Sequence, residues 1–177
     1  MTEDKYMKQA IHQVDNLAKP PGSLGLLEKQ AKKVLLAWGQ FHKDLRPKHL
    51  IFAADNGVVH SGVVAQLADI TYMQSRHMVE GTSAVTCFCR SQHIPYAVID
   101  VGIDSEDAVG IDRKIARGTR DFAKEPAMSE EQFQQALAAG REQVEAAKAE
   151  GINLLSFGEM GIGNTTTSAA EIGRAHV

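Results

Sequence analysis

The sequence predicts an α/β fold: a three-layer, Rossmann-like parallel sheet is flanked by helices, and the N-terminal helices form part of a smaller helical subdomain. Short apolar runs alternate with amphipathic helical segments, which is typical of parallel strands covered on both faces. Each of three such runs is followed by a polar loop that contains glycine. The chain has 177 residues, which is long enough for a globular domain with a substantial core.

The N-terminal region predicts two helices joined by a rigid connector. Apolar side chains recur at helical spacing over residues 3–18 and again over residues 24–38. Between them, Lys19–Ser23 contains two prolines and a glycine, which cannot continue a helix. We interpret Lys19–Gly25 as a helix–helix turn in which Ser23 caps the second helix.

The remainder of the chain predicts alternating strands and helices. The segment 129–150 is the clearest helix, because Ser129 and Gln132 form a capping box at its start. Residues 104–128 lack periodicity and are predicted to be irregular, and a last helix begins near Thr165. The predicted strands are 49–54, 95–101 and 152–157, and the predicted helices are 68–79, 83–91 and 129–150.

The loops after the three predicted strands are the first candidates for a functional site. Ligands in open α/β sheets bind beyond the carboxyl ends of the strands. Two of these loops are Asp55–Gly57 and Asp100–Asp104. The third, Gly158–Thr167, is the most informative, because it has three glycines within six residues, followed by an asparagine and three threonines where a helix begins.

The loop Gly158–Thr167 fits a phosphate site, because glycines let backbone N–H groups approach a ligand and a helix N-terminus favours negative charge. It is not a Walker loop, since no lysine follows the last glycine, and its glycine spacing differs from the Rossmann fingerprint. The same pattern also fits a structural turn with a threonine cap, and both interpretations stay open on spacing alone. Glu159 is either a functional carboxylate, near ribose hydroxyls or a developing positive charge, or a solvent-exposed side chain.

Composition excludes several classes of protein. The net charge of −3 gives no basic excess to bind nucleic acid. Cys87 and Cys89 are one residue apart, which fits neither a zinc site nor an unstrained disulfide, so we expect two reduced thiols. No apolar run is long enough to span a membrane, and the acidic N-terminus does not resemble a signal peptide. We therefore expect a cytoplasmic protein that binds neither nucleic acid nor membranes.

Four segments, each weakly specific alone, occur in one order and spacing that resembles a known family. They are Lys19–Gly25, Ala53–Val58, Asp100–Asp104 and Gly158–Thr166. Together they resemble the nicotinate-nucleotide–dimethylbenzimidazole phosphoribosyltransferases over about residues 5–170. The resemblance implies transfer of phosphoribose from nicotinate mononucleotide to 5,6-dimethylbenzimidazole, giving α-ribazole 5'-phosphate for the nucleotide loop of cobalamin. It implies no metal, no cofactor and a homodimer at full length.

The resemblance also implies roles for individual residues. It places Glu159 at the reacting groups and the donor phosphate beside the glycine loop. One departure is visible: the family commonly has histidine where this chain has Asn56. The implied phosphate- and nucleotide-binding residues are Gly161, Asn164, Thr165 and Thr166, and the implied base-binding residues are Gln74, Pro21 and Ser23.

The family's members are about twice as long as this chain, and their catalytic base, a glutamate near the C-terminus, has no counterpart here. We expect residues 1–170 to be a partial domain that is inactive alone. Residues 171–177 are expected to be a non-native tail, because Gly173 interrupts the apolar helix and 172–177 match a translated sequencing adapter. The alternative is a non-catalytic α/β module that binds a nucleotide or phosphate.

Overall fold

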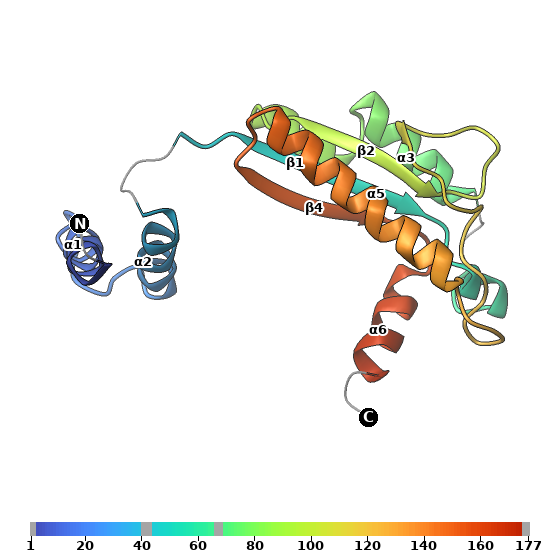
Figure 1. The fold of residues 1–177 in the computed structure, drawn as a ribbon, viewed down its shortest axis with the longest axis horizontal. Coiled ribbons are helices and arrows are strands. Elements are labelled where there is room, and N and C mark those ends of the chain that lie inside the picture. The colour runs from blue at the N-terminus through green and yellow to red at the C-terminus, as the bar shows by residue number, and fades with distance from the viewer. Residues whose placement is uncertain (1–2, 40–43, 66–68, 175–177) are drawn as a thin grey trace. The chain divides into compact units, whose positions relative to one another are not determined.

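The computed structural model describes residues 3–39, 44–65 and 69–174. The chain divides into two compact units, Met1–Leu45 and Arg46–Val177. The first unit contains the two N-terminal helices, and the second contains the sheet with its covering helices (Figure 1). The N-terminal helices thus form a small compact unit of their own.

The first unit is a pair of packed helices, α1 (Glu3–Asp15) and α2 (Leu26–Trp38). Apolar side chains of α1 face α2, and Ala10 is fully buried. The hydroxyl of Tyr6 donates to the carbonyl of Leu35 at 3.0 Å, which fixes how the two helices meet. Both predicted helices are confirmed, although each is shorter than its apolar periodicity indicates.

The prediction that Ser23 caps α2 is wrong. The residue at the N-cap position is Gly25, whose φ is 54°, and no side chain caps it. The chain instead makes two successive turns, in which the N–H of Ser23 donates to Pro20 and that of Gly25 donates to Gly22. Because the turns extend beyond Ser23, the helix begins at Leu26.

The second unit is built on one parallel sheet. Its strands are β1 (Pro47–Ala54), β2 (Tyr96–Gly102), β3 (Ile111–Asp112) and β4 (Leu154–Met160), in the order β3-β2-β1-β4. Every adjacent pair is parallel, which confirms the predicted α/β class. The two-residue strand β3 lies within the segment predicted to be irregular, since so short a strand leaves no pattern in the sequence.

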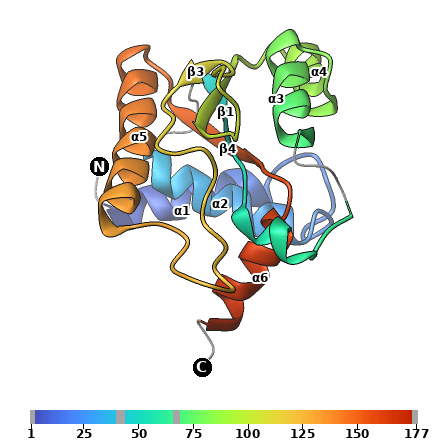
Figure 2. The same cartoon turned by 90° about the vertical axis from the view of Figure 1, so that its right-hand side faces the viewer.

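Helices cover both faces of the sheet, giving the predicted three layers. The helices α3 (Ile70–Glu80) and α4 (Ala84–Ser91) lie on one side, and α5 (Glu130–Ala149) lies on the other (Figure 2). The two inner strands β1 and β2 carry the core of the sheet, with Leu50 and Ile51 of β1 each 1% exposed and Ile99 of β2 fully buried. The start of α3 at residue 68, as predicted, lies outside the described residues.

The predicted capping box at the start of α5 is confirmed. The N–H of Gln132 donates to the hydroxyl of Ser129, and the N–H of Ser129 donates to the side-chain oxygen of Gln132 at 2.8 Å. These two bonds satisfy backbone donors that the first helical turn leaves free. The long connection from β2 therefore ends at a defined residue, and α5 returns along the sheet to β4.

The strand β4 extends further than its sequence predicts. The sequence predicts a strand over 152–157 and a loop from Gly158, whereas Gly158, Glu159 and Met160 pair with β1. Gly158 is a packing residue, since a Cβ there would lie 2.9 Å from Nε2 of His49. The loop therefore begins at Gly161, and α6 (Asn164–Arg174) follows within one residue of the predicted start.

The structure describes only part of the segment 171–177, which was predicted to be a non-native tail. Glu171–Arg174 continue α6, while residues 175–177 of the predicted tail lie outside the described residues.

Cys87 and Cys89 of α4 are free thiols, and burial raises the pKa of the Cys89 thiol. None of the helices described is long and apolar enough to cross a membrane.

Candidate active site

The loops that follow β1, β2 and β4 meet at one edge of the sheet, because parallel strands end on the same side. Hydrogen bonds join the first two loops. A carboxylate oxygen of Asp55, after β1, accepts the N–H of Asp104, after β2, at 2.8 Å. The backbone of Asp55 also bonds Gly102 and Thr119. The predicted motifs Asp55–Gly57 and Asp100–Asp104 are thus brought together.

Asp100, the buried aspartate of the second motif, organises the loop after β2. Its side chain is fully buried and accepts the backbone N–H groups of Gly102, Ile103 and Val109 at 2.9–3.2 Å. The ammonium of Lys114 lies 3.4 Å from the same carboxylate. These bonds occupy the carboxylate and shape the loop, so we assign Asp100 a structural role.

The loop after β4 approaches β1 so closely that two of its residues must be glycine. A Cβ on Gly161 would lie 2.3 Å from the carbonyl oxygen of Ala54, closer than real Cβ atoms approach any heavy atom. Gly163 has a φ of 86°, in the left-handed region that side chains disfavour. The glycines therefore let the loop fold back over the end of β1 before α6 begins.

Glu159 stands at the mouth of this loop with the residues predicted to bind the phosphate. It is the penultimate residue of β4, it is exposed, and its carboxylate accepts Nδ2 of Asn164 at 2.6 Å. The hydroxyl of Thr165 donates to Oδ1 of Asn164 at 3.3 Å. The N–H of Thr166 closes the first turn of α6 on the carbonyl of Gly163. Hydrogen bonds thus join Glu159, Asn164 and Thr165, and Thr166 lies beside them in the first turn of α6.

The helix α3 reaches the same loop through Thr71. Its side chain is fully buried, and its Oγ1 accepts the N–H of Ile162 at 3.1 Å. Gln74, predicted to bind the base, is exposed three residues further along α3. Residues three apart lie on neighbouring parts of a helix surface, so the location of Gln74 is compatible with its predicted role.

The other predicted base-binding residues, Pro21 and Ser23, lie in the first unit and are exposed. Their loop is organised by Glu28, a residue that is only 6% exposed. It accepts the ammonium of Lys19 at 2.7 Å and the N–H of Leu24 at 3.1 Å. Glu28 thus fixes the form of the Lys19–Gly25 motif from the first turn of α2.

Replacing Glu28 with glutamine should remove an acid sensitivity of this loop. The hydrogen bond from Lys19, followed by that from the Leu24 N–H, lowers the pKa of Glu28 below its ordinary value of 4.5. A carboxyl with a lowered pKa stabilises the fold above its unfolded pKa, and this contribution is lost as pH falls through the folded pKa. The wild-type advantage over Glu28→Gln in unfolding temperature should therefore hold above pH 4.5 and disappear below it.

The measurement for Glu28 can follow the first unit alone, because Trp38 is the single tryptophan of the chain and lies at the end of α2. Its fluorescence during thermal unfolding is recorded between neutral and acidic pH for both proteins. A wild-type advantage that stayed constant down to about pH 2.5, well below an ordinary glutamate pKa, would contradict the assigned role of Glu28.

A family model described as "Phosphoribosyltransferase" matches residues 1–175 of the chain. A relative from Clostridium perfringens, named nicotinate-nucleotide–dimethylbenzimidazole phosphoribosyltransferase, is 42% identical over 171 residues. The chain belongs to this phosphoribosyltransferase family. A relative of the same name from Geobacter sp. (strain M21) is 40% identical over 174 residues. The crystal structure of CobT from Thermus thermophilus matches with a TM-score of 0.87 at 38% identity.

The chain spans about half the length of the phosphoribosyltransferases it matches. The alignments cover 95% of this chain but 47% of the C. perfringens relative, and 96% but 50% of the Geobacter relative. The match to the T. thermophilus structure covers 94% of this chain and 51% of that one. The fold described here therefore corresponds to about half of each relative.

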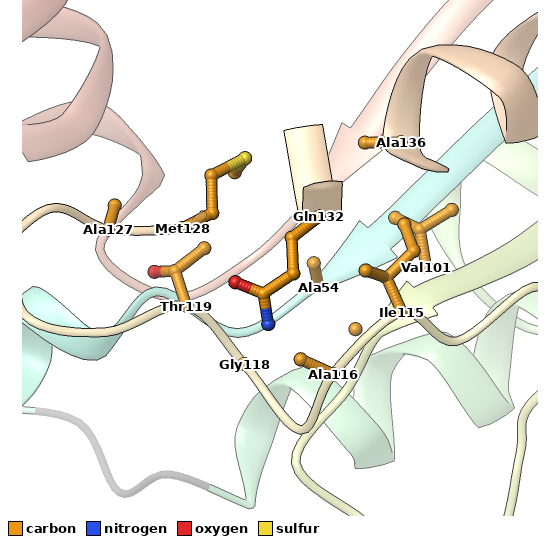
Figure 3. Close-up of a pocket in the computed structure, with 11 residues that line it drawn as sticks. Ala54, Val101, Ile115, Ala116, Gly118, Thr119, Ala127, Met128, Gln132 and Ala136 are labelled. Carbon is orange, nitrogen blue, oxygen red and sulfur yellow. The ribbon is translucent and has the colours of Figure 1, made fainter. Parts of the chain in front are cut away.

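An apolar cavity of about 100 Å³ lies at the ends of β1 and β2, on the side of the sheet that α5 covers (Figure 3). Apolar residues such as Ala54, Val101 and Met128 make up most of its lining. Its two polar side chains are already bonded, since Thr119 accepts the N–H of Gly57 and Gln132 accepts that of Ser129. Among the described residues, no three His, Cys, Asp or Glu side chains are placed to hold a metal ion.

The structure adds residues that sequence reasoning did not assign to the site. Thr71 bonds the loop after β4, and Asn56 and Thr167 bond each other across it. Thr71 carried a usable signal, since it precedes Gln74 by one helical turn. Thr167 lies within the predicted loop but was not among the predicted ligands. Asn56 was part of the predicted motif Asp55–Gly57, but no role at the site was assigned to it.

Proposed function

We propose that this chain supplies the donor-binding half of an enzyme that transfers phosphoribose from nicotinate mononucleotide to 5,6-dimethylbenzimidazole. The products are α-ribazole 5'-phosphate, used for the nucleotide loop of cobalamin, and nicotinate. The observation that carries the proposal is the gathering of Glu159, Asn164 and Thr165 around the glycine loop in a member of this family. Relatives that share about 40% of its residues are named for this reaction.

The reaction breaks the bond from the ribose C1' to the pyridinium nitrogen and forms a bond from C1' to a benzimidazole nitrogen. The electron pair of the broken bond neutralises the pyridinium, so nicotinate leaves without a general acid. The benzimidazole N–H proton passes to a base. We propose that Glu159 stabilises the positive charge that develops on the ribosyl centre.

In this proposal the donor phosphate binds where the loop meets α6. The backbone of Gly161 and the side chains of Asn164, Thr165 and Thr166 contact it, helped by the N-terminal dipole of the helix. The carboxylate of Glu159 bonds Asn164 in the structure, which keeps it at the edge of the anion site. This geometry supports a phosphate at the helix and a ribose beside the carboxylate.

The other half of the longer protein supplies the catalytic base in this proposal, so the 177-residue chain has no turnover alone. Gln74, Pro21 and Ser23 bind the benzimidazole. The enzyme acts as a cytoplasmic homodimer, uses no metal or cofactor, and binds neither nucleic acid nor membranes. The acidic net charge supports the proposal that it does not bind nucleic acid. The two free thiols support a reducing compartment such as the cytoplasm.

A fusion of residues 1–170 to the second half of the T. thermophilus relative tests this function. The intact relative serves as the positive control, and circular dichroism establishes that the fusion is folded. We expect the folded fusion to release nicotinate from nicotinate mononucleotide only when dimethylbenzimidazole is present. A folded fusion that binds the donor but forms no product would favour a non-catalytic nucleotide-binding module, and one that binds neither substrate would exclude both functions.

A further inference from the structure

The side chain of Asn56, which follows β1, holds the loop between β4 and α6 at two points. Its Nδ2 donates to the carbonyl oxygen of Ile162 at 3.2 Å. Its Oδ1 accepts a hydrogen bond from Oγ1 of Thr167, in the first turn of α6, at 2.9 Å. One half-buried amide therefore ties the end of β1 to both sides of the loop.

An asparagine suits this position because it donates and accepts in the same planar group. The carbonyl of Ile162 can only accept, so the NH₂ of Asn56 faces it and the oxygen is left for Thr167. An aspartate would place an oxygen against the Ile162 carbonyl, and an alanine would bond neither partner. The path of this loop therefore requires one side chain that both donates to Ile162 and accepts from Thr167.

The loop packs tightly around Asn56, and a second contact holds it from α3. A Cβ on Gly161 would lie 2.8 Å from Nδ2 of Asn56, and one on Gly163 would lie 3.5 Å from its Cβ. The N–H of Ile162 is held by the buried Oγ1 of Thr71. Because both the N–H and the carbonyl of Ile162 are bonded, the two peptide planes that flank it are fixed.

We propose that Asn56 is a positioning residue that fixes the loop between β4 and α6 in its binding conformation before a ligand arrives. The inference rests on the proposed function, which makes this loop the donor-phosphate site. The carbonyl and N–H of one trans peptide point in opposite directions, so holding the Ile162 carbonyl toward Asn56 turns the Gly163 N–H away from it. A loop that is ordered in advance loses less conformational entropy when it binds.

Hydrogen exchange on the 177-residue chain tests whether Asn56 orders the loop. In Asn56→Ala, the hydrogen-bonded amides of Ile162 and Asn164 should exchange about tenfold faster, as expected for the loss of two anchoring bonds. Thr167→Val should give part of this acceleration. The double variant should exchange no faster than Asn56→Ala, because the shared bond is already lost. Unchanged exchange in Asn56→Ala would overturn the proposal.

Asn56→Asp adds a pH signature that general destabilisation does not produce. An ionised carboxylate cannot donate to Ile162, whereas a protonated carboxyl can donate and accept as the amide does. After correction for intrinsic exchange, the loop of Asn56→Asp should be fast near pH 7 and approach the wild-type rate at about pH 3, where an ordinary aspartate is mostly protonated. Asn56→Ala should be fast at both values. Equal acceleration of the aspartate variant at both pH values would contradict the two-point contact.

Calorimetry with nicotinate mononucleotide tests whether the ordered loop matters for binding. Asn56→Ala should bind about tenfold more weakly at a temperature where the protein is fully folded. The control Asn16→Ala removes an exposed amide that donates to His12 in the first unit, and it should leave the affinity unchanged. Accelerated loop exchange with unchanged affinity would overturn a positioning role. No binding by the wild-type chain would remove the proposed function, while the exchange rates would still decide whether Asn56 orders the loop.

Discussion

Gly161→Ala is expected to destabilise the second unit by about 1–3 kcal/mol, the usual cost of forcing an added group into a packed site. The added Cβ would lie 2.3 Å from the carbonyl oxygen of Ala54 and 2.8 Å from Nδ2 of Asn56. The backbone oxygen is held in place, because Ala54 belongs to β1, which pairs with a strand on each side. The loop must therefore shift, which also separates the residues gathered around Glu159, so donor binding should weaken. Thermal unfolding followed by circular dichroism measures the stability change.

The matched control is Gly140→Ala in α5. No heavy atom lies within 4 Å of a Cβ at this position, and its φ is not positive. Alanine is favoured over glycine in a helix interior, so this variant should be as stable as wild type or more stable by about 0.5–1 kcal/mol. If Gly161→Ala unfolded at the same temperature as Gly140→Ala, the close approach of the loop to β1 would be wrong.

Glu159→Gln is expected to lower the turnover of the active fusion by about 100- to 1,000-fold, the range seen when a group that stabilises transition-state charge is removed. Glutamine keeps the shape and an oxygen that can accept Nδ2 of Asn164, but it carries no negative charge. The unfolding temperature should change little, since the side chain is exposed. Initial rates of nicotinate release at saturating substrates measure the effect on kcat.

Glu106→Gln is the control for the loss of one negative charge. The Glu106 side chain is 91% exposed, and its nearest cation, on Arg117, is 3.9 Å away. Its turnover should match that of the unsubstituted fusion, because exposed ion pairs at such distances contribute little. Unchanged turnover in Glu159→Gln would identify Glu159 as a bystander and leave the phosphate loop without its proposed catalytic neighbour.

Predictions from local sequence patterns were correct where the pattern is typical of only one kind of structure. The capping box at Ser129 and the apolar run of β1 are confirmed because each signal is contained within a few residues. The prediction that a loop begins at Gly158 was wrong, because this glycine is a residue of β4 that packs against His49. The prediction that Ser23 caps α2 was wrong because it was argued from composition, whereas a second turn carries the backbone on to Gly25 before α2 begins.

The sequence predicted those residues of the candidate site that lie close to one another along the chain. Glu159, Asn164 and Thr165 are near neighbours along the chain, and the structure gathers them. Asn56 and Thr71 act on the same loop from about one hundred positions away, and no local pattern can show such a contact. The motifs that carried the family resemblance include Asn56, but only the structure shows what its amide bonds.

In the proposed function, the loop between β4 and α6 binds the donor nucleotide. The most direct test is a titration of the isotope-labelled 177-residue chain with nicotinate mononucleotide, followed by amide resonances. We expect saturable shifts centred on Gly161, Asn164, Thr165 and Thr166, with smaller shifts at Asn56. Saturable shifts centred elsewhere on the sheet, or none at millimolar donor, would contradict it.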